Sequence, residues 1–134
     1  MKLGTVPVFL LLAALAGTVH AQWPVKPIRF IVSFPPGGSA DLVARAIAPS
    51  MSERLGQPVV VENRPGAGGN IGVDAVAKSA PDGYTIGLAA AGALTVNPTL
   101  YASMPFDPQR DLAPITLLAM IPFLVVANPA APAS

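Results

Sequence analysis

Three short, mostly apolar runs are separated by stretches in which apolar residues recur at helical spacing. The runs cover residues 28–34, 59–63 and 84–90. The first run, IRFIVSF, is interrupted only by Arg29 and Ser33. Such continuity is typical of a central parallel strand that is buried on both faces. The alternation of strands and helices with short connections predicts an α/β fold with a parallel sheet and right-handed crossovers.

The first helical stretch follows the sequence PPGG and begins at Ser39, a residue type that favours the N-cap position. Gly56 is placed to end this helix as a C-cap. Pro49 falls in the third turn, where its missing N–H and its ring cost roughly 3 kcal/mol. We therefore expect a kink or a break near Ala48. The predicted packed face is a stripe at spacing four: Val43, Ile47, Met51 and Leu55.

The second helical stretch follows a glycine-rich turn, residues 64–69, and Asn70 is its predicted cap. We expect Ile71, Ala75 and Ser79 on its packed face. The sequence PDG at 81–83 predicts a turn that leads into the third strand. A small-residue loop at 91–93 follows that strand.

The expected strand order is 2-1-3, so the chain reverses its direction of winding between the first and third strands. Ligands of open α/β sheets bind outside the carboxyl ends of the strands at such a reversal. The loops after the first and third strands flank this point, and the glycine-rich loop after the second strand lies next to it. Because a helix N-terminus presents unpaired N–H groups and partial positive charge, these loops predict a site for a small carboxylate or phosphate.

The last third of the chain has a different pattern. We expect irregular structure beyond Asn97-Pro98. Residues 115–127 form an apolar run that is split by Pro122 and is too short to cross a membrane as a helix. Two short strands are the better interpretation of this run. Residues 128–134 have the composition of a linker.

The first 21 residues have the pattern of a cleavable export signal. Lys2 supplies the positive region, and residues 6–16 form an apolar segment that is too short to span a bilayer. The small residues at positions 19 and 21 predict cleavage after Ala21. We therefore expect a periplasmic protein with one domain of modest core.

Composition excludes several classes of function. Without the leader, which contains Lys2, seven Lys and Arg residues balance seven Asp and Glu residues. This neutral balance, with no basic run, argues against binding to nucleic acid. The chain has no Cys, and its single His, His20, lies in the leader. The usual zinc sites and the Ser-His-Asp or Cys-His nucleophiles therefore cannot be built, and neither a metal nor a cofactor is expected.

The glycines at 66–69 do not form a dinucleotide fingerprint. The pattern G-x-G-x-x-G requires glycine at position 71, which is Ile71. The chain also has no Gly-Lys pair, so a phosphate-binding P-loop is excluded. Arg64 is placed to steer anions or to pair with Glu62 or Asp74, whereas Arg45 is expected to be an ordinary surface charge.

Several segments in order resemble the Bug/TctC family of periplasmic solute-binding proteins, which serve tripartite tricarboxylate transporters. These segments are FPPGGSADLVAR, SERLGQPVVVENRPGAGGNIG, AVAKSAPDGYTIGL, NPTLY and FDPQRDLAPITLLA. The resemblance implies the first lobe of a two-lobed, type II periplasmic-binding-protein fold. Residues 22–113 would form this ligand-binding lobe, and residues 114–134 would form crossover strands and a linker into a second lobe that is missing.

The resemblance also implies which residues contact the ligand. For the amides at the start of the first helix, the helix-end argument given above selects the same residues. Backbone N–H donation is assigned to Gly38, Ser39 and Ala40, with help from the Ser39 hydroxyl. Asp41 is expected to stabilise the helix start, or to bind an amine if the ligand is an amino acid. The full set of candidate ligand-binding residues is Phe34, Gly37, Gly38, Ser39, Ala40, Asp41, Gly66, Ala67, Gly68, Gly69, Ala90, Ala91 and Gly92.

The function implied by the resemblance is a receptor for a small organic acid: a dicarboxylate, a tricarboxylate, an acidic amino acid or an aromatic acid. It would act as a monomer at full length, is not an enzyme, and would deliver its ligand to a membrane permease or a sensor protein. One lobe alone is expected to bind poorly, because small-molecule sites bury most of the ligand. Two alternatives remain: a truncated relic without function, and a nucleotide-binding or hydrolytic enzyme.

Overall fold

The sheet has three parallel strands in the order β2-β1-β3, as predicted. The computed structural model describes residues 22–122, 124 and 126–128, so the predicted export signal lies outside the described residues. The strands are β1 (Ile28–Val32), β2 (Val59–Asn63) and β3 (Thr85–Leu88). In the register, Phe30 pairs with Val61 on one side and with Ile86 on the other. The first and third strands are shorter than the apolar runs that predicted them.

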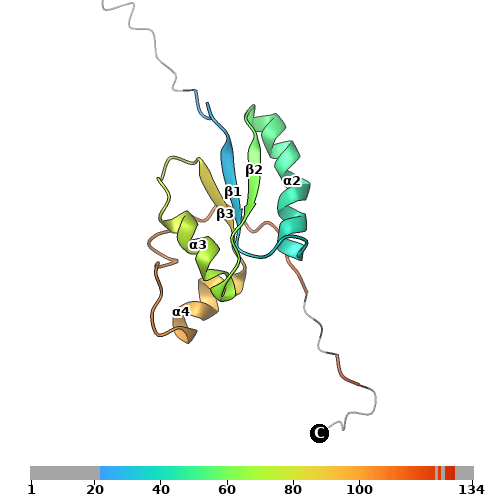
Figure 1. The fold of residues 1–134 in the computed structure, drawn as a ribbon, viewed down its shortest axis with the longest axis vertical. Helices are drawn as coiled ribbons and strands as arrows, with labels where there is room; N and C mark the ends of the chain where they lie inside the picture. The colour runs from blue at the N-terminus through green and yellow to red at the C-terminus, as the bar shows by residue number, and fades with distance from the viewer. Residues whose placement is uncertain (1–21, 123, 125, 129–134) are drawn as a thin grey trace, which may run out of the picture.

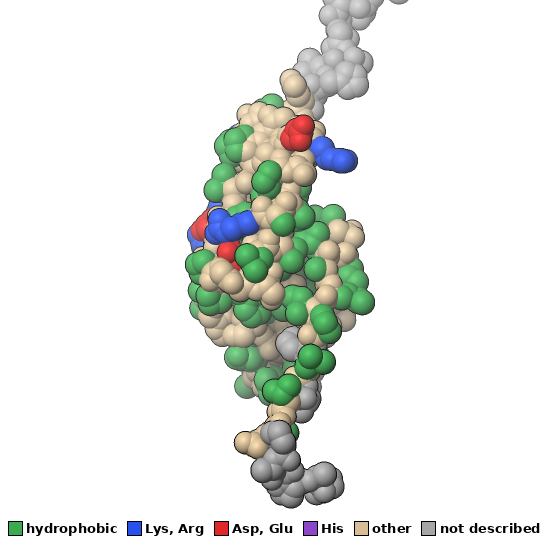
Figure 2. Space-filling view, turned by 90° about the vertical axis from the view of Figure 1, so that its right-hand side faces the viewer, with side chains coloured by type: hydrophobic (Ala, Val, Ile, Leu, Met, Phe, Trp, Pro, Cys, Tyr) green, Lys and Arg blue, Asp and Glu red, His purple; other side chains and the backbone are tan. Residues whose placement is uncertain are grey.

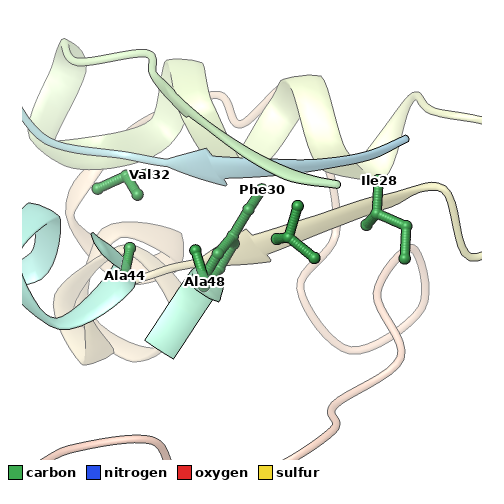
Figure 3. Close-up of a cluster of buried hydrophobic side chains, with 6 residues drawn as sticks. Ile28, Phe30, Val32, Ala44 and Ala48 are labelled. Carbon is green, nitrogen blue, oxygen red and sulfur yellow. The ribbon is translucent and has the colours of Figure 1, made fainter. Parts of the chain in front are cut away.

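Helix α2 (Ser39–Leu55) covers one face of the sheet (Figure 1). Alternate residues of β1 point toward it, and Phe30 and Val32 meet Ala44 and Ala48 of α2 in the core (Figure 3). The predicted packed face of α2, which begins at Val43, therefore lies to one side of the residues that contact the sheet most closely. The two alanines are buried, whereas Ile47, Met51 and Leu55 are partly buried at the flank. Small residues occupy the line of closest approach because they let the helix lie near the strands.

A kink or a break is expected near Ala48; α2 is continuous through Pro49, so a break is wrong. Pro49 is exposed, and the carbonyl of Arg45, its lost helical partner, lies one turn earlier. Ser52 reinforces the helix just after the proline: its hydroxyl donates to the Ala48 carbonyl at 2.8 Å and accepts from the Val59 N–H at 2.9 Å. The helix is thus fastened to the start of β2 immediately beyond the position where a bond is missing.

The opposite face of the sheet is covered by α3 (Asn70–Ala77), which follows a short 3-10 turn, η1 (Ala67–Gly69). The predicted packed face of α3 is wrong. Ile71 is 53% exposed, and the buried positions are Asn70, Gly72 and Val73. Val73 packs with Ala93 and Phe106 in a second apolar cluster. The side of α3 that meets the sheet is the side of Gly72, where no side chain keeps the helix away. It is not the side of the large apolar residue, Ile71.

A helical segment follows β3 where the sequence predicts a loop and then irregular chain. It consists of a π-helical turn, η2 (Gly92–Val96), and the short helix α4 (Asn97–Leu100). Pro98 lies in α4, which follows η2 directly, so helical structure continues through the proline. The proline that indicated the end of regular structure therefore lies within a helical segment.

The chain beyond α4 forms no strand within the described residues. Phe106 is buried in the second cluster, and residues 113–122 are exposed along their whole length. The two strands predicted within 115–127 are therefore wrong for the described part of that range, and residues 123 and 125 lie outside it. None of the helices described here combines the length and apolar character needed to cross a membrane.

Candidate functional site

The three loops that leave the carboxyl ends of the strands meet at one place. The contacts of Gly69 show this directly. A Cβ at position 69 would lie 3.5 Å from Cβ of Ser33, 3.5 Å from Cβ of Ala93 and 3.6 Å from Cζ of Phe34. Ser33 and Phe34 directly follow β1, and Ala93 lies in the segment after β3. The chain just after β1 and the chain just after β3 therefore both lie beside Gly69 of the second loop, at the edge of the sheet that the topology predicts.

The first loop leads into the N-terminus of α2. Gly38 is the N-cap and makes no side-chain capping bond, so the predicted cap, Ser39, is instead the first helical residue. Ser39 is exposed and Ala40 is partly buried. The N–H groups of a helix's first turn have no acceptor within the helix and carry partial positive charge. The first loop thus ends at the main-chain donors of the first turn of α2.

The second loop runs through consecutive residues with positive φ. These angles are 48° at Ala67, 64° at Gly68 and 97° at Gly69. Glycine adopts this region without the steric penalty of a Cβ, which explains the glycine-rich sequence. The N–H of Gly69 donates to the carbonyl of Gly66 at 2.9 Å, so the loop is internally tied. It delivers the chain to the first turn of α3 beside Phe34.

Asn70 does not cap α3 as predicted, because Gly69 holds the N-cap position. The Asn70 side chain is buried, and its carbonyl accepts a hydrogen bond of 2.7 Å from Nδ2 of Asn97. Nδ2 of Asn97 also lies 3.4 Å from the carbonyl of Gly68. Asn97, absent from the predicted site, thus links the start of α4 to the second loop. A polar residue beside an apolar stretch was its only signal in the sequence.

The third loop contributes small residues. Ala89 and Ala90 are partly buried, whereas Ala91 and Gly92 are exposed. The N–H of Ala93 donates to the carbonyl of Ala90 at 3.1 Å, which begins the helical turn. The predicted residues Ala90, Ala91 and Gly92 therefore lie at the entry to η2 rather than in an open loop. The two alanines offer methyl groups, and none of the three residues has a side-chain hydrogen-bond donor.

Asp41 is buried, with 3% of its surface exposed. Its carboxylate accepts hydrogen bonds from the Gly37 N–H at 2.9 Å, from Nε of Arg45 at 2.9 and 3.0 Å, and from Nδ2 of Asn63 at 2.9 Å. The bond from Arg45 is the largest of the causes that lower the pKa of Asp41 to about 2. Arg45 is therefore not the ordinary surface charge that the sequence predicts, and neither Arg45 nor Asn63 was assigned to the site.

Two further arginines, Arg29 and Arg64, pair with Glu62 at the end of β2. Arg64 bonds to Glu62, its Nε lying 2.7 Å from Oε1, which is one of the two pairings predicted for it. The bond from Arg29 and then that from Arg64 lower the pKa of Glu62. Among the described residues, no three His, Cys, Asp or Glu side chains gather as a metal site would require. A shallow hollow between α2 and β2 includes Arg45, Pro49 and Val61 in its lining.

The surface near the carboxyl ends of the strands carries little charge on one side. Figure 1 places these ends toward the lower half of the molecule. On the face shown in Figure 2, the charged side chains lie higher, and the lower part of the described surface shows hydrophobic and neutral side chains.

Solved structures of periplasmic binding proteins share the α/β fold of this chain. MatC from Rhodopseudomonas palustris, solved with bound malate, is 38% identical with a TM-score of 0.68, over 72% of this chain and 33% of MatC. A second protein of that bacterium, solved with adipate, is 40% identical with a TM-score of 0.62, over 65% of this chain and 29% of its own.

The sequence comparisons identify the family. Residues 43–134 match the model of the tripartite tricarboxylate transporter family receptor, TctC, and the chain belongs to this family. Protein BugT of Bordetella pertussis is 46% identical over 129 residues, which cover 95% of this chain and 40% of BugT. The chain therefore spans about two fifths of the length of this curated relative.

Proposed function

We propose that this chain supplies one wall of the ligand site of a periplasmic receptor for a small organic carboxylate. The observation that carries the proposal is the contact of Gly69 with Ser33, Phe34 and Ala93, because it brings three loop ends to one place. Membership of the TctC family supports it. So do the malate and adipate bound to two structures with the same fold.

The proposed binding mechanism uses the main chain. The first-turn N–H groups of α2 hold one carboxylate of the ligand, and the partial positive charge of the helix end stabilises it. The second loop and the start of α3 line the adjoining side. In the whole receptor, closure of a second lobe about a hinge would bury the rest of the ligand. The receptor would then present the ligand to a membrane permease or a sensor protein.

Binding without chemical conversion is the activity we assign. The sequence contains no Cys, and its single His is His20. The charged side chain nearest the first loop, Asp41, is held by four hydrogen bonds and is not placed as a general base. A site built from amides and methyl groups binds and releases an acid without altering it.

Nuclear magnetic resonance of the 15N-labelled chain, recovered from the periplasm, tests the proposal. Terminal sequencing of the same sample is a separate test, of cleavage after Ala21.

Titration with malate, adipate or citrate should shift the amide signals of residues 38–40 and 68–70 first. We expect dissociation constants on the order of millimolar, because half a cleft buries only part of the ligand. Adipamide, which has the same chain without charge, is the matched control.

The outcome is decided by where the signals move and by the charge of the ligand. Equal shifts with adipate and adipamide would show that the site does not recognise the carboxylate. Shifts confined to the hollow between α2 and β2 would place the ligand elsewhere. Either result contradicts the proposed function.

A further inference from the structure

A closed ring of polar contacts lies beneath the first glycine-rich loop. The Asp41 carboxylate accepts from the Gly37 N–H and from Arg45, four residues later on α2. Nη2 of Arg45 donates to Oδ1 of Asn63 at 3.1 Å, and Nδ2 of Asn63 donates back to Oδ1 of Asp41 at 2.9 Å. Each member of the ring is thus bonded to both of the others.

Asn63 connects this ring to the strands. It is the last residue of β2, where it pairs in register with Val32 of β1. Its Nδ2 also donates to the carbonyl of Phe34 at 3.0 Å. The ring therefore holds both ends of the first loop, since Asn63 binds the Phe34 carbonyl and Asp41 binds the Gly37 N–H.

The ring also places a negative charge beside a region that is proposed to bind anions. A carboxylate in this position repels an anionic ligand unless a cation offsets its charge. Arg45 supplies that cation, with its Nε 2.9 Å from Oδ2 of Asp41. The Arg45 side chain is 52% exposed, whereas that of Asp41 is 4% exposed. The positive partner thus stands on the solvent side and the carboxylate is enclosed.

We propose that Arg45 is a positioning residue of the anion site: through Asp41 and Asn63 it holds the first loop in place, and it cancels the carboxylate charge that would otherwise repel the ligand. The inference rests on the proposed function and goes beyond it, because Arg45 need not touch the ligand. It predicts that the affinity for anions depends on the charge balance of the Asp41–Arg45 pair.

The test compares Arg45→Met with Lys78→Met. Lys78 also pairs with an aspartate four residues earlier, Asp74, at 2.7 Å, but on α3. Both variants lose one positive charge, so the net charge of the protein changes equally. Hexanoate and adipate serve as ligands with one and two charges. Arg45→Met should weaken hexanoate binding by about threefold and adipate binding by about tenfold, whereas Lys78→Met leaves both within about twofold.

The double variant Asp41→Asn/Arg45→Met provides the rescue. It removes both charges and keeps a side-chain oxygen that accepts from the Gly37 N–H, so adipate affinity should return to within about threefold of the wild type. The selective loss in Arg45→Met should also shrink in roughly 0.5 M salt, because screening shortens the range of the exposed charge. Amide spectra of each variant verify that the fold is intact.

Each outcome bears on the proposal. A larger loss for adipate than for hexanoate, recovered in the double variant, supports it. Equal behaviour of Arg45→Met and Lys78→Met overturns it while the proposed function stands. So does an equal loss for both ligands without recovery, since that result describes a purely structural residue. Failure of the wild-type chain to bind either acid overturns the proposed function and this inference together.

Discussion

Gly72 of α3 lies directly against Ser33 at the end of β1. A Cβ at position 72 would come within 2.7 Å of the Ser33 Cα and within 2.8 Å of the Arg64 carbonyl oxygen. Separations this short leave no room for any side chain at position 72. The helix therefore touches the sheet backbone to backbone. This close approach is what brings the preceding loop, with Gly69, against Phe34.

Replacing Gly72 by alanine should push α3 away from the sheet. We expect Gly72→Ala to lower the free energy of unfolding by about 1–3 kcal/mol, as overpacked cores do. Urea denaturation followed by circular dichroism measures this loss. Gly38→Ala is the matched control, because a Cβ there has the Pro35 carbonyl oxygen at 3.6 Å as its nearest neighbour. Equal stability of the two variants would contradict the observed packing.

The hydrogen bond between Asn70 and Asn97 should contribute strongly to the stability of the fold. Both side chains are buried, and truncation of Asn97 leaves the Asn70 carbonyl without its 2.7 Å partner. We expect Asn97→Ala to destabilise the chain by about 1–3 kcal/mol, the cost of an unsatisfied buried polar group. Thr95→Ala removes an exposed hydroxyl that bonds to the Ala91 carbonyl and should cost much less. Differential scanning calorimetry distinguishes the two.

Acid should weaken the fold through Asp41. The folded state holds the pKa of this carboxyl at about 2, below its ordinary value of 3.8. Stabilisation from a lowered pKa is complete above the unfolded value and is lost as the pH falls through the folded value. Urea midpoints of the wild type should therefore fall between about pH 4 and pH 2.

The Asp41→Asn variant isolates this effect. The pKa values of Glu62 and Asp111 are also lowered by their arginine partners, and these groups remain in the variant. The variant should thus lose less stability than the wild type over the same pH range. Parallel curves for the two proteins would show that Asp41 does not have the lowered pKa.

Pro49 offers a stabilising substitution. It is exposed within an unbroken helix, where proline lacks the N–H that would bind the Arg45 carbonyl. Pro49→Ala should restore this bond and raise stability by about 1 kcal/mol, less than the full propensity difference because proline also restricts the unfolded chain. Thermal unfolding measures the gain. A lower melting temperature in the variant would mean that the proline fits the helix without loss.

The sequence was informative where local pattern and topology agree. Apolar runs and glycine-rich turns predicted the strand order 2-1-3 and the region where the loops meet, and both features depend on short-range signals combined with general rules of chain winding. The sides of the helices that pack on the sheet were harder to predict. Ala44 and Ala48 carry little hydrophobic signal, yet they face the sheet, because packing distance rather than hydrophobicity selects them.

Other features were missed for identifiable physical reasons. The segment that begins at Gly92 is rich in Gly, Thr and Val, which are weak helix formers, so only tertiary contact explains its helical turns. The pairing of Asp41 with Arg45 was accessible from their spacing of four residues. The role of Asn63 was not, because its partners lie 18 to 29 positions away in the sequence and are set by the register of β1 and β2.

The first turn of α2 offers its donors from the peptide backbone, and this has an evolutionary consequence for the proposed site. Any amino acid except proline carries the same amide, so mutations at positions 38–40 can alter the side chains around the proposed site without removing its attraction for negative charge. Lineages that share this lobe are then free to diverge in which acid they prefer while retaining a common anchor for one end of it.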